Sequence, residues 1–181
     1  ECSPVMTMTR RDDPVELRVS TVGRLFEGVE GRIVDPQTGR ELPPNTKGEI
    51  VTRSRCVMRG YYKMPEETAQ AIDAEGWLHT GDVGVVDEQG YFSVTGRIKD
   101  IIIRGGENIY PREIEEFLHR NDKIADVYVV GVPDAKYGEE ILAVVKLHEG
   151  QSATADELRA FCDGKLARYR WAWRKRAVAD S

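Results

Sequence analysis

The pattern of apolar residues changes near residue 100, and this change limits the possible folds more than any other feature. In the first hundred residues, turns rich in Gly, Pro and Asp separate short strand-like runs, which lie at 29–34, 48–52, 83–86 and 91–94. Beyond them, two continuous apolar runs at 127–132 and 141–145 are typical of central strands covered on both faces. We therefore expect an α/β (α+β) chain, with a β-rich first part followed by a small α/β unit.

Helix signals fall between these runs. One helix is expected over 65–72. Pro65 suits its first position, and two acids lie in its first turn, where the helix dipole stabilises negative charge. Another begins at Pro111, and a third follows a capping box at 154–157. Between the two parts, Gly105 and Gly106 separate short apolar runs and predict a tight hairpin.

Charge divides the chain into an acidic body and a basic segment. The 181 residues carry a net charge of −5, with 26 basic and 31 acidic residues. Six basic residues and no acid lie at 165–176, so the remainder holds 20 basic against 31 acidic residues and gives no electrostatic footprint for nucleic acid. Within 168–176, aromatics alternate with cations, which fits stacking on bases, a membrane interface or a solvated terminus.

The three cysteines and three histidines are scattered. Cys2, Cys56 and Cys162 form no CxxC pair, so we expect no disulfide framework and a reducing, cytoplasmic compartment, and no Cys or His spacing suits zinc. No apolar run reaches the roughly 18–20 residues of a membrane span, and the start shows no signal peptide. Because an initiator Met is also absent, we expect a processed chain or a piece of a longer one.

Two short motifs could carry chemistry. Asp82 follows a glycine and is expected on a turn, where a carboxylate can accept hydrogen bonds from both hydroxyls of a ribose. The alternative is a turn aspartate that only caps its own backbone. Arg97 offers a fork of donors that suits phosphate or ribose, and the following hairpin has two glycines that let a ligand approach. The alternative there is a hairpin whose glycines only supply positive φ.

Together these motifs carry a resemblance to a known family. The sequence GWLHTGD at 76–82 is followed by GRIKDIIIRGGENIYPREIE at 96–115, then by GVPD at 131–134 and YGE at 137–139. In this order they closely resemble the acyl-adenylate-forming (AMP-binding) superfamily, and within it the fatty acyl-CoA synthetases, or medium- to long-chain acyl-CoA ligases. The resemblance runs from Glu1 to about Tyr169.

The resemblance implies an ATP-dependent acid–thiol ligase. Such enzymes convert a fatty acid and ATP, with Mg²⁺, to an acyl-AMP and pyrophosphate, and coenzyme A then displaces AMP to give the acyl-CoA thioester. A large AMP-binding domain holds most of the nucleotide and acyl pocket, and a small mobile domain turns between the half-reactions. The resemblance assigns 1–98 to the β-rich end of the large domain and 99–181 to an incomplete small C-terminal domain with an atypical tail at 170–181.

Site residues follow from the resemblance, position by position. Asp82 matches the acid that binds the ribose of ATP, and Arg97 matches the arginine that also contacts this ribose. Lys99 matches the hinge about which the small domain turns, and Glu1 ends a Thr-Glu element that helps to hold Mg²⁺ and ATP. The loop that lines the pantetheine path of coenzyme A is matched by Gly105, Gly106 and Glu107.

Two departures from the family limit what this chain is expected to do alone. The phosphate loop has no counterpart here, and neither Lys165 nor Lys175 lies in the motif of the lysine that promotes adenylation, so no catalytic residue is assigned. We therefore expect the isolated chain to be inactive. Two alternatives stay open, namely a non-catalytic module that binds a partner through its basic tail and a segment of an aryl- or alicyclic-acid CoA ligase.

Overall fold

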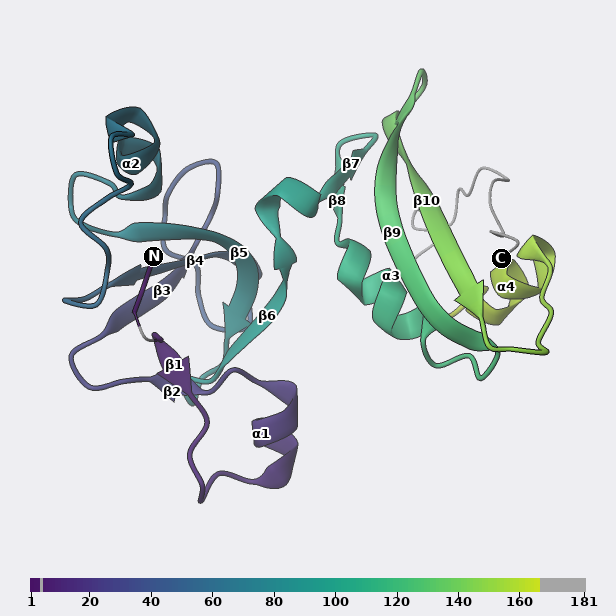
Figure 1. Cartoon of the computed structure of the whole chain (residues 1–181), viewed down its shortest axis with the longest axis horizontal. Coiled ribbons are helices and arrows are strands. Elements are labelled where there is room, and N and C mark those ends of the chain that lie inside the picture. The colour runs from purple at the N-terminus through teal and green to yellow at the C-terminus, as the bar shows by residue number, and fades with distance from the viewer. Residues whose placement is uncertain (4, 167–181) are drawn as a thin grey trace. The chain divides into compact units, whose positions relative to one another are not determined.

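The computed structural model describes residues 1–3 and 5–166, and the chain forms two compact units. The first ends at Ile98 and the second begins at Lys99. Each unit has its own four-stranded antiparallel sheet and its own apolar core (Figure 1). The fold is a strand-rich mixture of α and β elements, as expected. In the described part of the chain, no helix is long and apolar enough to cross a membrane.

The first unit is a sheet whose four strands are neighbours in both sequence and space, in the order β3-β4-β5-β6. These strands are β3 (Glu30–Val34), β4 (Gly48–Arg53), β5 (Leu78–Val86) and β6 (Phe92–Arg97). The remaining elements are β1 (Thr7–Met8), β2 (Arg24–Leu25), α1 (Val15–Ser20) and α2 (Pro65–Ala71). The predicted strands and helix are confirmed, but β5 begins at Leu78, well before the predicted residue 83.

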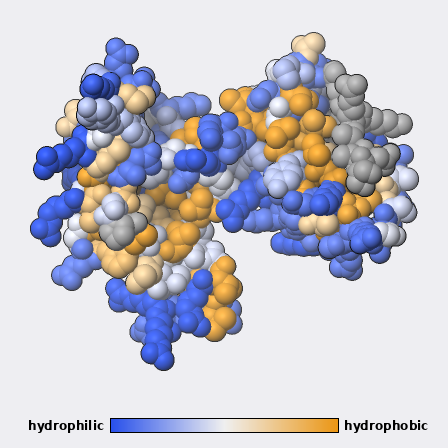
Figure 2. Space-filling model, viewed as in Figure 1, coloured by the Kyte–Doolittle hydropathy of each residue, from blue (hydrophilic) through white to orange (hydrophobic). Residues whose placement is uncertain are grey.

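Both faces of this sheet carry buried apolar side chains, because consecutive residues of a strand point to opposite faces. Two clusters result, Ile33, Ile50 and Phe92 in one and Val34, Val51 and Trp77 in the other. Helix α1 buries none of its residues, and Figure 2 shows apolar surface there, where Val15 and Val19 are 57% and 80% exposed. A charged side chain within β4 must therefore find its partners inside the protein.

The second unit has the strand order β8-β7-β10-β9. Its elements are η1 (Ile98–Asp100, beginning at the last residue of the first unit), β7 (Ile102–Arg104), β8 (Glu107–Ile109), α3 (Pro111–Leu118), β9 (Ile124–Asp134), β10 (Gly138–Leu147) and α4 (Ala155–Cys162). The predicted hairpin is confirmed, since Gly105 and Gly106 have φ of 59° and 88°, as a two-residue type I′ turn requires. The capping box of Thr154 and Glu157 is also confirmed.

Both helices of this unit pack on one face of its sheet. Alternate residues of β9 and β10 share a core with four helical side chains, Ile114 and Leu118 of α3 and Leu158 and Cys162 of α4. On β9, Tyr128 and Val130 are 63% and 47% exposed. The expectation that both strands are central and covered on both faces is therefore wrong. In the sheet formed by residues 99–166, β10 lies inside, whereas β9 is an edge strand with one exposed face.

Candidate functional site

A cavity of about 350 Å³ opens in the first unit. Strands β4, β5 and β6 contribute Ile50, Leu78, Phe92 and Val94 to its apolar wall. Three charged side chains line the same cavity, namely Glu1, Asp82 and Arg97. The structure therefore brings together three residues that lie far apart in the sequence and that the resemblance assigned to ATP and Mg²⁺.

Asp82 and Arg97 face each other across the strand pair β5–β6. They are direct partners in the antiparallel register, and Arg97 Nε lies 3.1 Å from Asp82 Oδ1. The side chain of Arg97 is 51% exposed and that of Asp82 38%, so both keep polar atoms available for a ligand. The sequence predicted Asp82 on a turn, and this is wrong, because Asp82 lies within the nine-residue strand β5.

Irregular pairing on both sides of β5 produces this arrangement. Between the β4–β5 pairs Glu49–Val83 and Val51–His79, three residues of β5 oppose Ile50 alone. Between the β5–β6 pairs Val83–Gly96 and Gly84–Val94, β6 has one extra residue. Such bulges re-aim side chains and leave ladder groups without a strand partner. Gly81 occupies the first bulge with φ of +70°, a conformation that glycine adopts readily.

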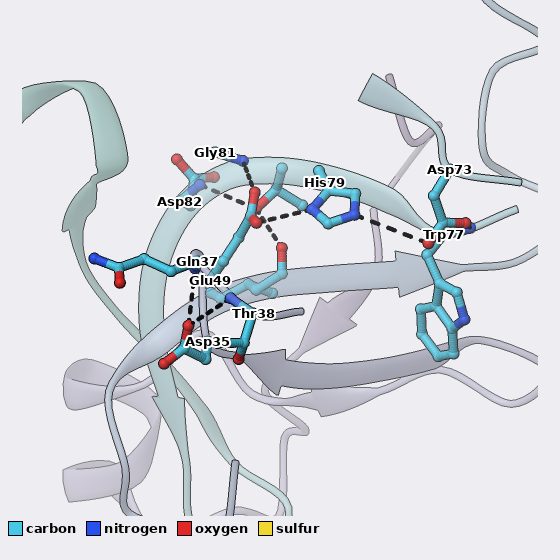
Figure 3. Close-up of polar contacts among 11 residues, drawn as sticks. Asp35, Gln37, Thr38, Glu49, Asp73, Trp77, His79, Gly81 and Asp82 are labelled. Carbon is cyan, nitrogen blue, oxygen red and sulfur yellow. Dashed lines mark hydrogen bonds and ion pairs between the residues drawn. The ribbon is translucent and has the colours of Figure 1, made fainter. Parts of the chain in front are cut away.

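Side chains replace the missing ladder bonds at the first bulge, as Figure 3 shows. The Gly81 N–H donates to Glu49 Oε1 at 3.2 Å, and the Asp82 N–H donates to Thr80 Oγ1 at 3.1 Å. The Thr80 hydroxyl in turn donates to the Ile50 carbonyl at 2.7 Å. The Gly81 amide is thus held by a side chain of β4, and the Asp82 amide by a side chain of β5.

Glu49 and His79 form a polar pair that sequence reasoning missed. Glu49 is only 6% exposed, and its Oε2 lies 2.8 Å from His79 Nδ1. Since a carboxylate only accepts hydrogen bonds, this nitrogen carries the proton. The other ring nitrogen lies 3.9 Å from Asp73 Oδ2 (Figure 3). The available signal was a glutamate inside the apolar strand 48–52, where a charge is costly without a partner.

Glu1 lies on the cavity wall with one polar neighbour fixed. The Tyr61 hydroxyl donates to Glu1 Oε1, and this hydrogen bond raises the pKa of the Tyr61 phenol. No group of three His, Cys, Asp or Glu side chains suited to a metal occurs in residues 1–3 and 5–166. Glu1 therefore offers a single carboxylate to a cation rather than a protein cage.

The residues assigned to coenzyme A lie in the second unit, at the tip of the β7–β8 hairpin. The Gly105 N–H donates to the Tyr137 carbonyl at 2.8 Å, and the Arg104 guanidinium lies 4.0 Å from the Tyr137 ring centroid. A side chain added at Gly106 would meet no atom within 4 Å, so its space is open. Lys99 lies in η1. The basic segment at 168–176 falls outside the described residues.

Comparison with known proteins identifies the family. Residues 1–62 match the AMP-binding enzymes, and residues 113–180 match the C-terminal domain of AMP-binding enzymes. The chain belongs to this family. The second match includes most of the segment 170–181, which was expected to be an atypical tail.

Its relatives include proteins named as an acyl-CoA synthetase and an acyl-CoA ligase. YngI of Bacillus subtilis (strain 168), which bears that name, is 54% identical over 170 residues, which are 94% of this chain and 31% of YngI. Mitochondrial medium-chain acyl-CoA ligase ACSF2 of Bos taurus is 46% identical over 94% of this chain and 28% of its own length. ATP-bound MatB from Rhodopseudomonas palustris matches with a TM-score of 0.86 and 37% identity, over 92% of this chain and 33% of MatB. The chain thus spans about three tenths of the length of these curated relatives.

Proposed function

We propose that the chain is a segment of an ATP-dependent acyl-CoA synthetase, referred to below as the parent enzyme. The single observation that carries the proposal is the Asp82–Arg97 pair, which two bulges aim at a cavity that Glu1 also lines. The family and the relatives named as acyl-CoA synthetases support the reaction type. The parent enzyme would activate a carboxylic acid as its acyl-AMP and then transfer the acyl group to coenzyme A.

In this proposal the Asp82 carboxylate accepts hydrogen bonds from the ribose hydroxyls of ATP. Arg97 donates to the same sugar and orients the carboxylate through their contact. Because the pair is already in place before the nucleotide arrives, little ordering is needed on binding. Both groups bind and orient the nucleotide, and neither makes or breaks a bond.

Glu1 fits a magnesium ion that is bound mainly by the phosphates of ATP. Mg²⁺ usually takes one or two carboxylates together with phosphate oxygens and water, and Glu1 supplies one carboxylate at the cavity. One of its oxygens already accepts from Tyr61, which holds the side chain in one orientation. When bound, the ion would neutralise phosphate charge during acyl-AMP formation.

We propose a fatty acid as the acid substrate. The name of ACSF2, a medium-chain acyl-CoA ligase, supports this choice. An aryl acid is the second candidate, because the o-succinylbenzoate CoA synthetase MenE from Bacillus subtilis matches with a TM-score of 0.75 and 33% identity, over 84% of this chain and 31% of MenE. Rates of acyl-CoA formation with fatty acids of increasing length and with benzoic acid would decide between the two.

Lys99 is proposed as the hinge, and the cytoplasm as the compartment. Lys99 lies in a 3₁₀ turn at the boundary between the two units, and such short turns commonly serve as connectors. The compartment is supported by three cysteines that are free in the structure. The name of ACSF2 places that relative in mitochondria.

The isolated 181-residue chain is expected to show no ATP–pyrophosphate exchange with a fatty acid. Neither a phosphate loop nor an adenylation lysine is assigned in it, and charge at the transferred phosphorus would go unstabilised. Exchange above the level of a blank without protein would contradict this expectation.

Gly106→Leu in the parent enzyme is expected to slow thioester formation about a hundredfold and to leave acyl-AMP formation within about twofold. The space beside Gly106 is open, so a leucine side chain would fill the proposed pantetheine path. ATP–pyrophosphate exchange measures acyl-AMP formation, and acyl-CoA production from supplied acyl-AMP measures thioester formation.

Gly90→Leu is the matched control for backbone strain. Gly90 has φ of 84° against 88° for Gly106, and neither has an atom within 4 Å of an added side chain. This control variant should retain both half-reactions. Normal thioester formation by Gly106→Leu would remove the hairpin from the coenzyme A path.

A further inference from the structure

We propose that Glu49 is a positioning residue of the nucleotide site. It lies on the opposite face of the sheet from the cavity, fixes the backbone at Gly81, and thereby sets the direction of the next side chain, Asp82. This inference rests on the proposed function, because it takes Asp82 to be the group that meets the ribose.

The first bulge creates the need for such a residue. Three residues of β5 oppose Ile50 alone, so the amides at Gly81 and Asp82 have no regular ladder partner on β4. Glu49 Oε1 accepts from the first amide at 3.2 Å and Thr80 Oγ1 from the second at 3.1 Å. Of the acceptors for these two amides, Glu49 is the one that belongs to β4.

Glu49 and the residues that line the cavity lie on opposite faces of the sheet. Ile50, Thr80 and Asp82 line the cavity, whereas Glu49 and His79, which precede two of them, occupy the alternate strand positions. Glu49 can therefore brace the backbone without touching the nucleotide. Figure 3 shows the Glu49 carboxylate between the His79 ring and the Gly81 amide.

The burial of Glu49 also favours a positioning role. The carboxylate is almost fully buried, and burying a paired charge seldom stabilises a fold more than an apolar residue of similar size would. His79 donates to Glu49 at 2.8 Å and lies near Asp73 on its other side, which limits rotation of the carboxylate. The fixed acceptor then holds Gly81.

Gly81 needs this hold because its conformation is not imposed by packing. An added side chain at Gly81 would meet no atom within 4 Å, so glycine is required for its φ of +70° and not for lack of space. Glycine adopts several other conformations at little cost. Without Glu49 the bulge would sample them, and Asp82 would lose its fixed place opposite Arg97.

Steady-state kinetics of the parent enzyme test the inference. Glu49→Ala is expected to raise the KM for ATP about tenfold, with kcat and the KM for the acid within about twofold. General destabilisation would lower the active fraction, and hence kcat, and would not raise one KM alone. Glu30→Ala is the matched control, because Glu30 is paired with Arg53 on the same sheet but away from the bulge. This variant should change neither kcat nor either KM.

Conservative variants separate the geometry of the acceptor from its charge. Glu49→Gln keeps an oxygen for the Gly81 amide, and its KM for ATP should stay within about threefold of the unmodified value. His79→Asn keeps an N–H near the place of Nδ1, so its KM for ATP should also stay within about threefold of the unmodified value. His79→Leu removes the donor and should raise this KM. A KM for ATP unchanged in Glu49→Ala, or raised equally in Glu49→Gln, would overturn the inference.

A measurement without nucleotide distinguishes this failure from failure of the proposed function. If Asp82→Ala leaves the KM for ATP unchanged, the ribose role of Asp82 is wrong, whatever Glu49 does. In the 181-residue chain, NMR hydrogen exchange should then still be about tenfold faster at the Gly81 amide in Glu49→Ala, and the Arg97 Nε–H resonance should shift. If both signals are unchanged, Glu49 does not position the bulge.

Discussion

Replacing Asp82 by alanine in the parent enzyme is expected to raise the KM for ATP about a hundredfold and to leave the KM for the acid within about twofold. If Asp82 binds the ribose as proposed, the variant loses two charge-assisted hydrogen bonds to this sugar, and it also frees Arg97, whose Nε lies 3.1 Å from the carboxylate. Initial rates at varied ATP measure the effect. The KM for ATP of Asp82→Asn should lie between those of the unmodified enzyme and Asp82→Ala, because an amide keeps one acceptor oxygen.

Asp35→Ala is the matched control for this prediction. Asp35 represents the alternative that the sequence left open for Asp82, because its Oδ1 accepts from the Gln37 and Thr38 amides of its own turn at 2.8 Å (Figure 3). Its loss should affect the turn and leave the KM for ATP unchanged. Equal effects of Asp35→Ala and Asp82→Ala would mean that Asp82 is only a structural residue.

Arg104→Leu is expected to lower the unfolding free energy of the second unit by about 3 kcal/mol. Arg104 binds Glu140 through two hydrogen bonds of 2.8 and 3.2 Å, and the two side chains are 11% and 7% exposed. These bonds raise the pKa of the Arg104 guanidinium, and its loss would leave the buried Glu140 carboxylate without its charged partner, with the Ile141 N–H still donating to Oε1 at 2.9 Å. Urea unfolding, followed by NMR signals of β9 and β10, measures the change.

An exposed ion pair in the same unit provides the comparison. Arg112 and Glu116 are paired at 2.9 Å on α3 with side chains 55% and 61% exposed, so Arg112→Leu should change stability by less than about 0.5 kcal/mol. Replacing Arg104 and Glu140 together by leucine should recover part of the loss, because no charge is then left buried. Similar losses in Arg104→Leu and Arg112→Leu would contradict this account of the pair.

Local signals predicted most of the elements correctly. The turn at Gly105–Gly106 and the capping box at Thr154 depend only on neighbouring residues, so their sequence is enough to predict them. The positions of β9 and β10 within the sheet were harder to predict from their apolar runs. Composition alone does not show whether a run lies inside a sheet, and in β9 the exposed Tyr128 and Val130 belong to an edge strand.

The sequence proposes residues for the candidate site but does not predict their geometry. The motif containing Asp82 marked the residue, yet the structure places it in a strand opposite Arg97 because bulges on both sides of β5 adjust the register. Register irregularities arise from pairing between distant segments, which a local motif does not encode. For the same reason, the contact between Glu49 and His79, 30 residues apart, could not be predicted.

The most direct test of the Asp82 assignment compares ATP with 2′,3′-dideoxy-ATP in the parent enzyme. If Asp82 binds the ribose hydroxyls, Asp82→Ala should raise the KM for ATP about a hundredfold and the KM for the dideoxy nucleotide by less than about threefold. The carboxylate has no hydroxyls to accept from in the second case. An equal rise of KM for both nucleotides would contradict the assignment.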